Sequence, residues 1–330
     1  MISDLNAQGY LMSYPDAFRP MGDKISSDDF AAYKTAAVSY EDELYGVPFD
    51  SGVAALFYRT DYLSEIGYTE EDMQDLTWEE YLSLGEQLKT KGHMLQTYNP
   101  NDIAEFQIML QSAGKWFTNE KGEADFIDNA ALEECYSIFK QLNEADYTKV
   151  VSDWTEFAGA INSGEVACVL RGCWMTSTLM AEESQSGKWA LAPIPKMNAE
   201  GATHYSNQGG SSWFVLNDSP NSEIAADFLA KTFGSSTELY NTLLKEKSII
   251  GTFLPATDVE AYEETSEFFS NQQVNKLLGD WMTKIPAVDT GAFSAEAQNS
   301  LVSVTPAILE GGDLAENLAT AEEQFKQSIQ

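Results

Sequence analysis

The segment from Gly164 to Trp174 constrains the fold of this chain more than any other stretch. At its centre, Val166–Leu170 is a short apolar run with β-branched residues, which is too short for a helix and is typical of a buried strand. Ligands of open α/β sheets bind outside the carboxyl ends of the strands. Trp174, directly after this run, is therefore positioned either as a flat wall for a ligand or as a core residue, and the local sequence favours neither.

Helix signals alternate with strand signals over most of the 330 residues, which predicts the α/β class and about two domains. Glu80 follows Thr77 at the spacing of a capping box, which marks the start of one helix. A later helix should begin after Asp128-Asn129 and bury one apolar stripe. The stripe consists of Leu132, Cys135, Tyr136, Phe139 and Leu142.

Two further segments, Leu44–Phe49 and Gly52–Tyr58, have the composition of strands. Pro48 interrupts the first, and proline is confined to the edges and ends of strands. The sequence therefore predicts two strands, with Phe49, Asp50 and Ser51 at a strand end between them.

The chain carries 52 acidic and 19 basic residues, which gives a net charge of −33. Repulsion of phosphate argues against nucleic acid as a partner. The same charge disfavours anionic ligands that lack a local basic pocket, so a neutral ligand fits best. An acidic excess is also explained simply as a solubility device.

Cysteine and histidine are scarce, with three Cys, two His and no CxxC motif. Neither a metal site nor Cys–His catalysis is predicted, and no cofactor is expected. No stretch approaches eighteen apolar residues, so no transmembrane segment is predicted. Met1 is not followed by the basic and apolar segments of a signal peptide, so a leader is expected to be absent from this chain.

Five short motifs follow one another over more than two hundred residues. They are Tyr45–Pro48 with Ala55–Asp61, Leu76–Glu80, Asn162–Cys168 with Gly172–Trp174, Gly209–Trp213, and Phe253–Ala256. In this order they resemble the family 1 extracellular solute-binding proteins of ABC transporters, the sugar-binding group that includes maltose-binding protein.

The resemblance implies a type II fold like that of the periplasmic binding proteins, in which two α/β lobes close on a ligand. Hinge strands should cross between the lobes near Ser51–Phe57, Gln208–Trp213 and Leu254–Thr257. Residues 1–57 and 208–254 would then form the first lobe. Residues 58–207 and 255–330 would form the second lobe.

The resemblance also implies which residues contact the ligand, because such contacts come from the hinges, the loop after the strand and the cleft edge. An aromatic ring covers the C–H face of a sugar, and carboxylates and amides bind its hydroxyls. For Trp154, packing of a helix is an equal alternative, and Gly209-Gly210 could serve only a close backbone approach. The expected contacts are Phe49, Asp50, Ser51, Trp174, Gly209, Gly210 and Ser211, followed by Trp116, Asp102, Trp154, Arg171 and Phe293.

The chain departs from the family pattern at its beginning. The family has several strands and helices ahead of the position matched by Asp4–Tyr14, so an N-terminal segment is expected to be missing. The first lobe should then be the incomplete remnant of a parallel sheet with an exposed apolar edge. Sugar affinity should be weak or absent in this chain.

The resemblance implies a non-enzymatic, monomeric, extracytoplasmic component of an ABC importer, at the cell surface or in the periplasm. It would capture a neutral mono- or oligosaccharide and deliver it to the permease subunits. A glycoside hydrolase is an alternative, since two facing carboxylates suffice for that chemistry, but Asp50 and Asp102 could pair by chance among 52 acidic residues. A carbohydrate-binding surface domain without a transport role is the third possibility.

Overall fold

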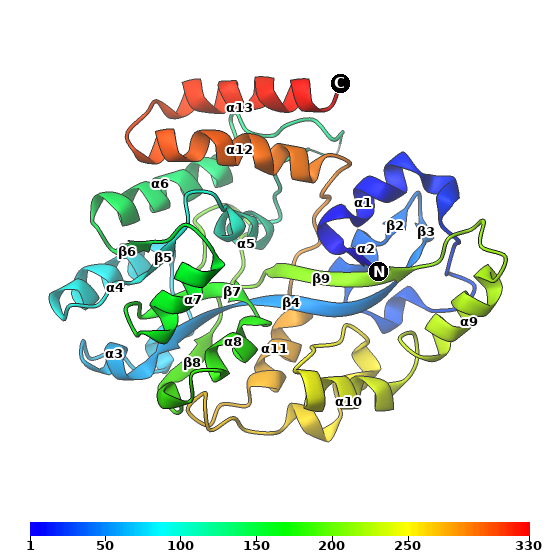
Figure 1. Cartoon of the computed structure of the whole chain (residues 1–330), viewed down its shortest axis with the longest axis horizontal. Coiled ribbons are helices and arrows are strands. Elements are labelled where there is room, and N and C mark those ends of the chain that lie inside the picture. Colours follow the sequence, from blue (N-terminus) through cyan, green and yellow to red (C-terminus); the bar gives the residue numbers. More distant parts are fainter. Residues whose placement is uncertain (120) are drawn as a thin grey trace.

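The computed structural model describes residues 1–119 and 121–330, and it combines helices and sheets as the α/β class requires (Figure 1). The strands are β1 (Ile2–Ser3), β2 (Ser39–Tyr40), β3 (Glu43–Leu44), β4 (Gly46–Arg59), β5 (Gln96–Tyr98), β6 (Thr148–Val150), β7 (Cys168–Gly172), β8 (Trp189–Ala192) and β9 (Asn207–Phe214). The helices are α1 (Asp4–Ser13), α2 (Ala32–Ala37), α3 (Thr60–Ser64), α4 (Trp78–Thr90), α5 (Ala104–Ser112), α6 (Ala130–Glu144), α7 (Trp154–Asn162), α8 (Met175–Met180), α9 (Ser222–Lys231), α10 (Thr237–Lys247), α11 (Val274–Met282), α12 (Ser294–Leu309) and α13 (Leu314–Ser328).

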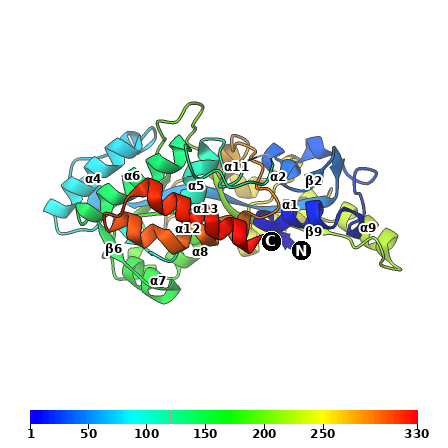
Figure 2. The same ribbon diagram turned by 90° about the horizontal axis from the view of Figure 1, so that it is seen from above.

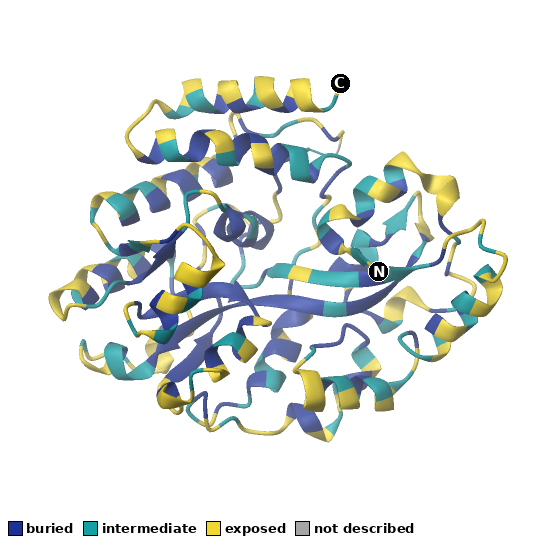
Figure 3. Ribbon diagram, viewed as in Figure 1, coloured by how far each residue is buried: buried dark blue, intermediate teal, exposed yellow. Residues whose placement is uncertain are grey.

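Strand β4 is the strand with which β7, β8 and β9 all pair. It is 14 residues long and buried along almost its whole length (Figure 3). Its first part, Gly46–Val53, pairs with β9, which pairs in turn with β1. Its second part, Ala54–Arg59, lies between β7 and β8. β4 therefore continues through the sheet from one end of the molecule to the other.

Two expectations about these strands are wrong. The five-stranded sheet is antiparallel at every pairing of its named strands, because β4 and β9 run between the two ends of the molecule in opposite directions. The two strands predicted on either side of Phe49–Ser51 are one continuous strand. Register shifts between Pro48 and Asp50, and between Ser51 and Val53, accommodate the proline without ending the strand.

Hydrophobic cores occupy the two ends and the middle. The largest core lies among α4, α5, α6, α12 and α13, at the left of Figure 1, and a smaller one lies between α9, α10 and the first part of β4 at the right. Viewed from above, α4 and α9 lie at opposite ends of an elongated molecule (Figure 2). A third core joins side chains from both proposed lobes, including Tyr33 and Val53 on one side and Trp189 and Trp281 on the other. The exact lobe boundaries given above remain a proposal.

The local helix signals are confirmed. The Thr77 and Glu80 side chains each accept a hydrogen bond from the other residue's backbone N–H and form the capping box of α4. Asn129 caps α6 by accepting from the Leu132 N–H, and the predicted apolar stripe of α6 is buried. Among residues 1–119 and 121–330, no helix is long and apolar enough to cross a membrane.

Candidate functional site

A cavity of about 330 Å³ lies between the two ends of the molecule. Its walls come from α1 and α2 on one side, from α5 and the segment that follows it on the other, and from the start of β9 in between. The lining side chains that can recognise a ligand are Asp4, Tyr33, Gln107, Gln111, Trp116, Trp174, Asn207, Gln208 and Thr290. The cavity is thus enclosed by elements from both lobes of the fold.

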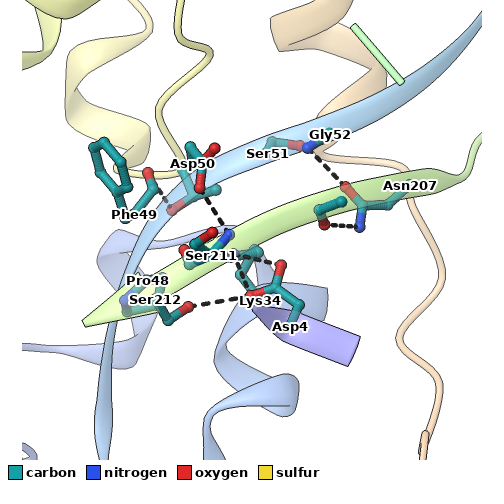
Figure 4. A network of polar contacts seen from close by, with 12 residues as sticks. Asp4, Lys34, Pro48, Phe49, Asp50, Ser51, Gly52, Asn207, Ser211 and Ser212 are labelled. Atoms are coloured by element: carbon teal, nitrogen blue, oxygen red, sulfur yellow. Dashed lines mark hydrogen bonds and ion pairs between the residues drawn. The ribbon is translucent and has the colours of Figure 1, made fainter. Parts of the chain in front are cut away.

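A buried ion pair supports the first-lobe wall (Figure 4). The Lys34 side chain has no exposed surface, and its Nζ donates to Asp4 Oδ1 at 2.7 Å and to the Ser211 carbonyl oxygen at 3.0 Å. Burial raises the pKa of the Asp4 carboxyl above its ordinary value, while the Lys34 ammonium group acts in the opposite direction. The pair joins α1, α2 and β9 beneath the cavity and fixes the Asp4 carboxyl at its wall.

Gly210 is required by this arrangement. A Cβ atom at this position would lie 2.5 Å from Asp4 Oδ2 and 2.8 Å from the Asp50 carbonyl oxygen. Its φ of 89° is also in the region that favours glycine. Any side chain here would push Asp4 away from β9 or fill the cavity.

Asn207 links the two crossing strands at the cavity. Its Oδ1 accepts from the Gly52 N–H at 2.9 Å and from the Tyr33 hydroxyl at 3.3 Å, and its Nδ2 donates to the Gly209 carbonyl oxygen at 2.7 Å. The Tyr33 hydroxyl is also hydrogen-bonded to the Ser51 hydroxyl. One asparagine therefore connects β4, α2 and β9 where the lobes meet.

Helix α5 supplies the polar part of the second-lobe wall. Gln107 and Gln111 are four residues apart and so lie on one face of the helix. Gln111 Oε1 accepts from the Asn207 N–H at 3.1 Å, which ties α5 to β9. Behind this face, Glu105 on α5 forms an ion pair with Arg171 on β7, with 2.5 Å between Oε1 and the guanidinium nitrogen. Burial raises the pKa of the Glu105 carboxyl, and Arg171 opposes this effect.

Two tryptophans provide the apolar surface of the cavity. Trp174, immediately before α8, is 40 % exposed, and its Nε1 donates to the Gln208 carbonyl oxygen at 3.0 Å. Trp116 is mostly buried, and its Nε1 donates to Ser294 Oγ at 2.7 Å. Each indole N–H is thus already bonded to the protein, and only ring surface is left for a ligand.

Of the twelve predicted site residues, four line this cavity: Trp116, Trp174, Gly209 and Gly210. Three lie directly behind its wall. Asp50 Oδ1 accepts from the Ser211 N–H at 2.7 Å, and Ser51 bonds to Tyr33. These three residues can shape the cavity through their neighbours.

The other five lie outside the cavity lining. Phe49 packs against Phe233, with ring centroids 5.0 Å apart, in the right-hand core. Arg171 is engaged by Glu105, and Asp102 accepts from the Ala104 N–H near the start of α5. Trp154 is 52 % exposed and stacks on Phe157, with its ring centroid 5.9 Å from that of Trp174. Phe293 precedes α12 and packs edge-on against Phe325.

Sequence reasoning missed Asp4, Tyr33, Gln107, Gln111, Asn207, Gln208 and Thr290. Gln107 and Gln111 had a usable signal, since two amides at helical spacing lie among the apolar residues of one helix. The role of Asp4 had no local signal, because its partner Lys34 lies 30 residues away.

The profile of the family described as "Bacterial extracellular solute-binding protein" matches residues 1–274. A lactose-binding protein of Rhizobium radiobacter is 40 % identical, and the match covers 100 % of this chain and 78 % of the relative.

Solved structures give the same architecture. A crystal structure of an "Extracellular solute-binding protein family 1" aligns with a TM-score of 0.85 at 17 % identity, over 100 % of this chain and 85 % of the other. The galacto-N-biose-/lacto-N-biose I-binding protein of the ABC transporter from Bifidobacterium longum, in complex with lacto-N-biose, aligns with a TM-score of 0.77 at 19 % identity. That match covers 99 % of this chain and 81 % of the other.

Proposed function

Because this chain belongs to the bacterial extracellular solute-binding protein family, we propose that it captures a neutral sugar in the cavity between its lobes. The observation that carries the proposal is the lining of that cavity. It combines the exposed ring of Trp174 with a carboxyl group and several amides that converge from both lobes. An aromatic surface beside polar rim groups matches the apolar face and the hydroxyl rim of a pyranose.

The ligand class that we propose is a neutral disaccharide or oligosaccharide with a β-galactoside unit. The lactose-binding relative supports this choice through its 40 % identity over the whole chain. A cavity of about 330 Å³ also lies in the usual range for small-molecule sites, roughly 300–1,000 Å³. The excess of acidic residues agrees with an uncharged ligand.

Family membership implies an extracytoplasmic location. There the protein would act at the cell surface or in the periplasm and pass its sugar, chemically unchanged, to the permease subunits of an ABC importer. Neither Asp50 nor Asp102, the two carboxylates of the hydrolase alternative, is among the residues that line the cavity, which supports the non-catalytic function. Asp50 accepts from the Ser211 N–H, and Asp102 lies near Arg171.

Isothermal titration calorimetry with lactose, maltose, galactose and a neutral peptide tests this function. We expect saturable binding of lactose, weaker or no binding of the peptide, and recovery of intact lactose after incubation. This differs from the weak affinity expected from the sequence, because residues of this chain line a cavity with elements from both lobes. Binding of only peptides or anions would contradict the sugar assignment, and release of galactose and glucose would contradict the absence of catalysis.

A further inference from the structure

A second cavity of about 480 Å³ lies against the first. We call it the outer chamber. It is formed within the second lobe by the segment after α5 and by Ala287–Asp289, the stretch between α11 and α12. Trp116 and Val288 line both cavities, so the outer chamber adjoins the inter-lobe cavity across these two side chains.

Trp116 is held rigidly at this boundary. Its indole N–H is bonded to Ser294 on α12, and its ring packs edge-on against Phe117, with centroids 5.2 Å apart. Thr118 lies next to it and donates from Oγ1 to the Thr290 carbonyl oxygen at 3.2 Å. The boundary is therefore a fixed aromatic edge bonded on both sides.

The lining of the outer chamber differs from that of the inter-lobe cavity. It is more polar and contains the ammonium group of Lys115 and the carboxyl groups of Asp125 and Asp289. Lys115 and Asp125 both line the chamber, and burial raises the pKa of the Asp125 carboxyl while the positive charge of Lys115 opposes that rise. The chamber therefore offers a positively charged hydrogen-bond donor and negatively charged acceptors. This mixture suits a polyhydroxyl group better than an ion or an apolar group.

We propose that the outer chamber is a second sugar subsite, which takes further units of an oligosaccharide whose first units occupy the inter-lobe cavity. The chain would cross the edge of Trp116. This inference rests on the proposed function and narrows it, because it makes the preferred ligand an oligosaccharide longer than a disaccharide.

Two variants isolate the outer chamber from the inter-lobe cavity. Lys115→Ala removes an exposed ammonium group that lines only the chamber, and Ala287→Trp fills the chamber from an exposed position that is likewise outside the cavity lining. Lys140→Ala on α6 is the matched control, since Lys140 is a partly exposed lysine that lines neither space. Circular dichroism establishes that all three variants fold.

Calorimetry then compares lactose with two trisaccharides, in which lactose is extended by a galactosyl unit at one end or the other. We expect one trisaccharide to bind the unmodified protein about tenfold more tightly than lactose does, the scale of one or two added hydrogen bonds. Lys115→Ala and Ala287→Trp should abolish this advantage and leave the lactose affinity within twofold, while Lys140→Ala should change neither.

Equal affinity for lactose and both trisaccharides would overturn the subsite and leave the proposed function intact. A loss of lactose affinity in Lys115→Ala equal to the loss for the trisaccharide would also overturn it. Failure of every saccharide to bind would overturn the proposed function together with the subsite.

Discussion

Lys34 is completely buried, and its charge is balanced by Asp4. Removing one member of such a pair leaves an uncompensated charge in the protein interior, which is far more costly than removing both. The pair also holds the cavity wall in place, since Lys34 bonds to β9 and Asp4 lines the cavity. Stability and binding therefore depend on the same two side chains.

A double-mutant cycle measures this dependence. Asp4→Asn and Lys34→Met should each lower the free energy of unfolding by about 3–5 kcal/mol, because each leaves one buried charge without its partner. The combined variant should lose clearly less than the sum of the two single changes. Urea unfolding gives the three values. Lys326→Met, which breaks an exposed pair with Glu322, is the control and should cost at most about 1 kcal/mol. Additive losses at Asp4 and Lys34 would show that the two do not act as a pair.

Trp174 provides the test of ligand contact at the residue scale. Trp174→Ala should weaken sugar binding by about 1–3 kcal/mol, because the stacking surface of the cavity is lost. Trp174→Phe keeps an aromatic face and should lose less. Stability should change little, since Trp174 is 40 % exposed.

Trp78→Ala is the contrasting control, because Trp78 is fully buried in the left-hand core. It should lower the free energy of unfolding by about 3–5 kcal/mol. Calorimetry measures the sugar affinity of both variants, and thermal unfolding measures their stability. A Trp174→Ala variant with normal affinity and a large loss of stability would assign Trp174 to the core.

At the scale of elements, the Glu105–Arg171 pair attaches α5 to β7 and so positions the two glutamines of the cavity. Burial raises the pKa of Glu105 above its ordinary value of 4.5. A carboxyl that binds its proton more tightly in the folded state contributes stability that is fully present below the unfolded pKa. This contribution is lost as the pH rises through the folded pKa.

The raised pKa of Glu105 predicts how the effect of Glu105→Gln on stability depends on pH. The free energy of unfolding of the unmodified protein, minus that of the variant, should fall as the pH rises from about 4 to 7. Glu165→Gln should show the opposite sign, since hydrogen bonding to Lys149 lowers the pKa of the Glu165 carboxyl, so that its contribution is present above the ordinary value of 4.5 and is lost only as the pH falls below it. Urea unfolding from about pH 3 to 7 covers both changes. Parallel slopes in the two variants would refute the assigned direction for Glu105.

Elements with strong local signals could be predicted from the sequence. The apolar run at Val166–Leu170 predicts a strand, and the structure has it as β7, shifted by two residues toward the carboxyl end. Thr77 and Glu80 predict the cap of α4. The sequence predicts two strands in place of β4 because proline normally ends a strand, whereas here a shift in register accommodates Pro48. At that shift the Ser211 N–H bonds to the Asp50 side chain, and a partner 161 residues away leaves no local trace.

Residues of the site can be predicted where the local sequence carries a signal, and not where a partner distant in the sequence places them. Trp174 follows a recognisable strand end, and Gly209-Gly210 is a conspicuous pair, so local sequence located them. Phe49 neighbours the predicted hinge, but side chains alternate across a strand, and its ring packs into the core with Phe233. Which side of a crossing strand faces a cavity is decided by tertiary packing, and composition does not reveal it.

At the scale of the whole molecule, a side-chain link spans the two lobes beside the cavity. Gln8 on α1 accepts at Oε1 from the Thr290 N–H at 2.7 Å and from its hydroxyl at 3.0 Å. Close packing accompanies the link, since a Cβ atom at Gly9 would lie 2.7 Å from the Ala292 carbonyl oxygen. If the lobes separate to admit a ligand, these contacts have to break or move with it.

Gln8→Ala should therefore favour the open arrangement. We expect a larger radius of gyration for the unliganded variant in small-angle X-ray scattering. Sugar affinity should be lower by up to about tenfold, the scale of one or two hydrogen bonds. Gln8→Glu keeps the accepting oxygen but loses the donation from Nε2 to the Ala36 carbonyl oxygen at 3.3 Å, so its radius should lie closer to that of the unmodified protein than to that of Gln8→Ala. An unchanged radius in Gln8→Ala would mean that the link does not contribute to closure.

Strand β4 has a consequence for dividing this protein. Its residues before Ala54 complete the pairing of β9, and its residues from Ala54 onward complete the pairing of β7 and β8. A gene fragment encoding one lobe without β4 would leave a sheet with an unpaired edge in what is now the interior, where bare N–H and C=O groups promote aggregation. Anyone who wished to produce the lobes as separate polypeptides would have to supply the same strand twice, once in each fragment.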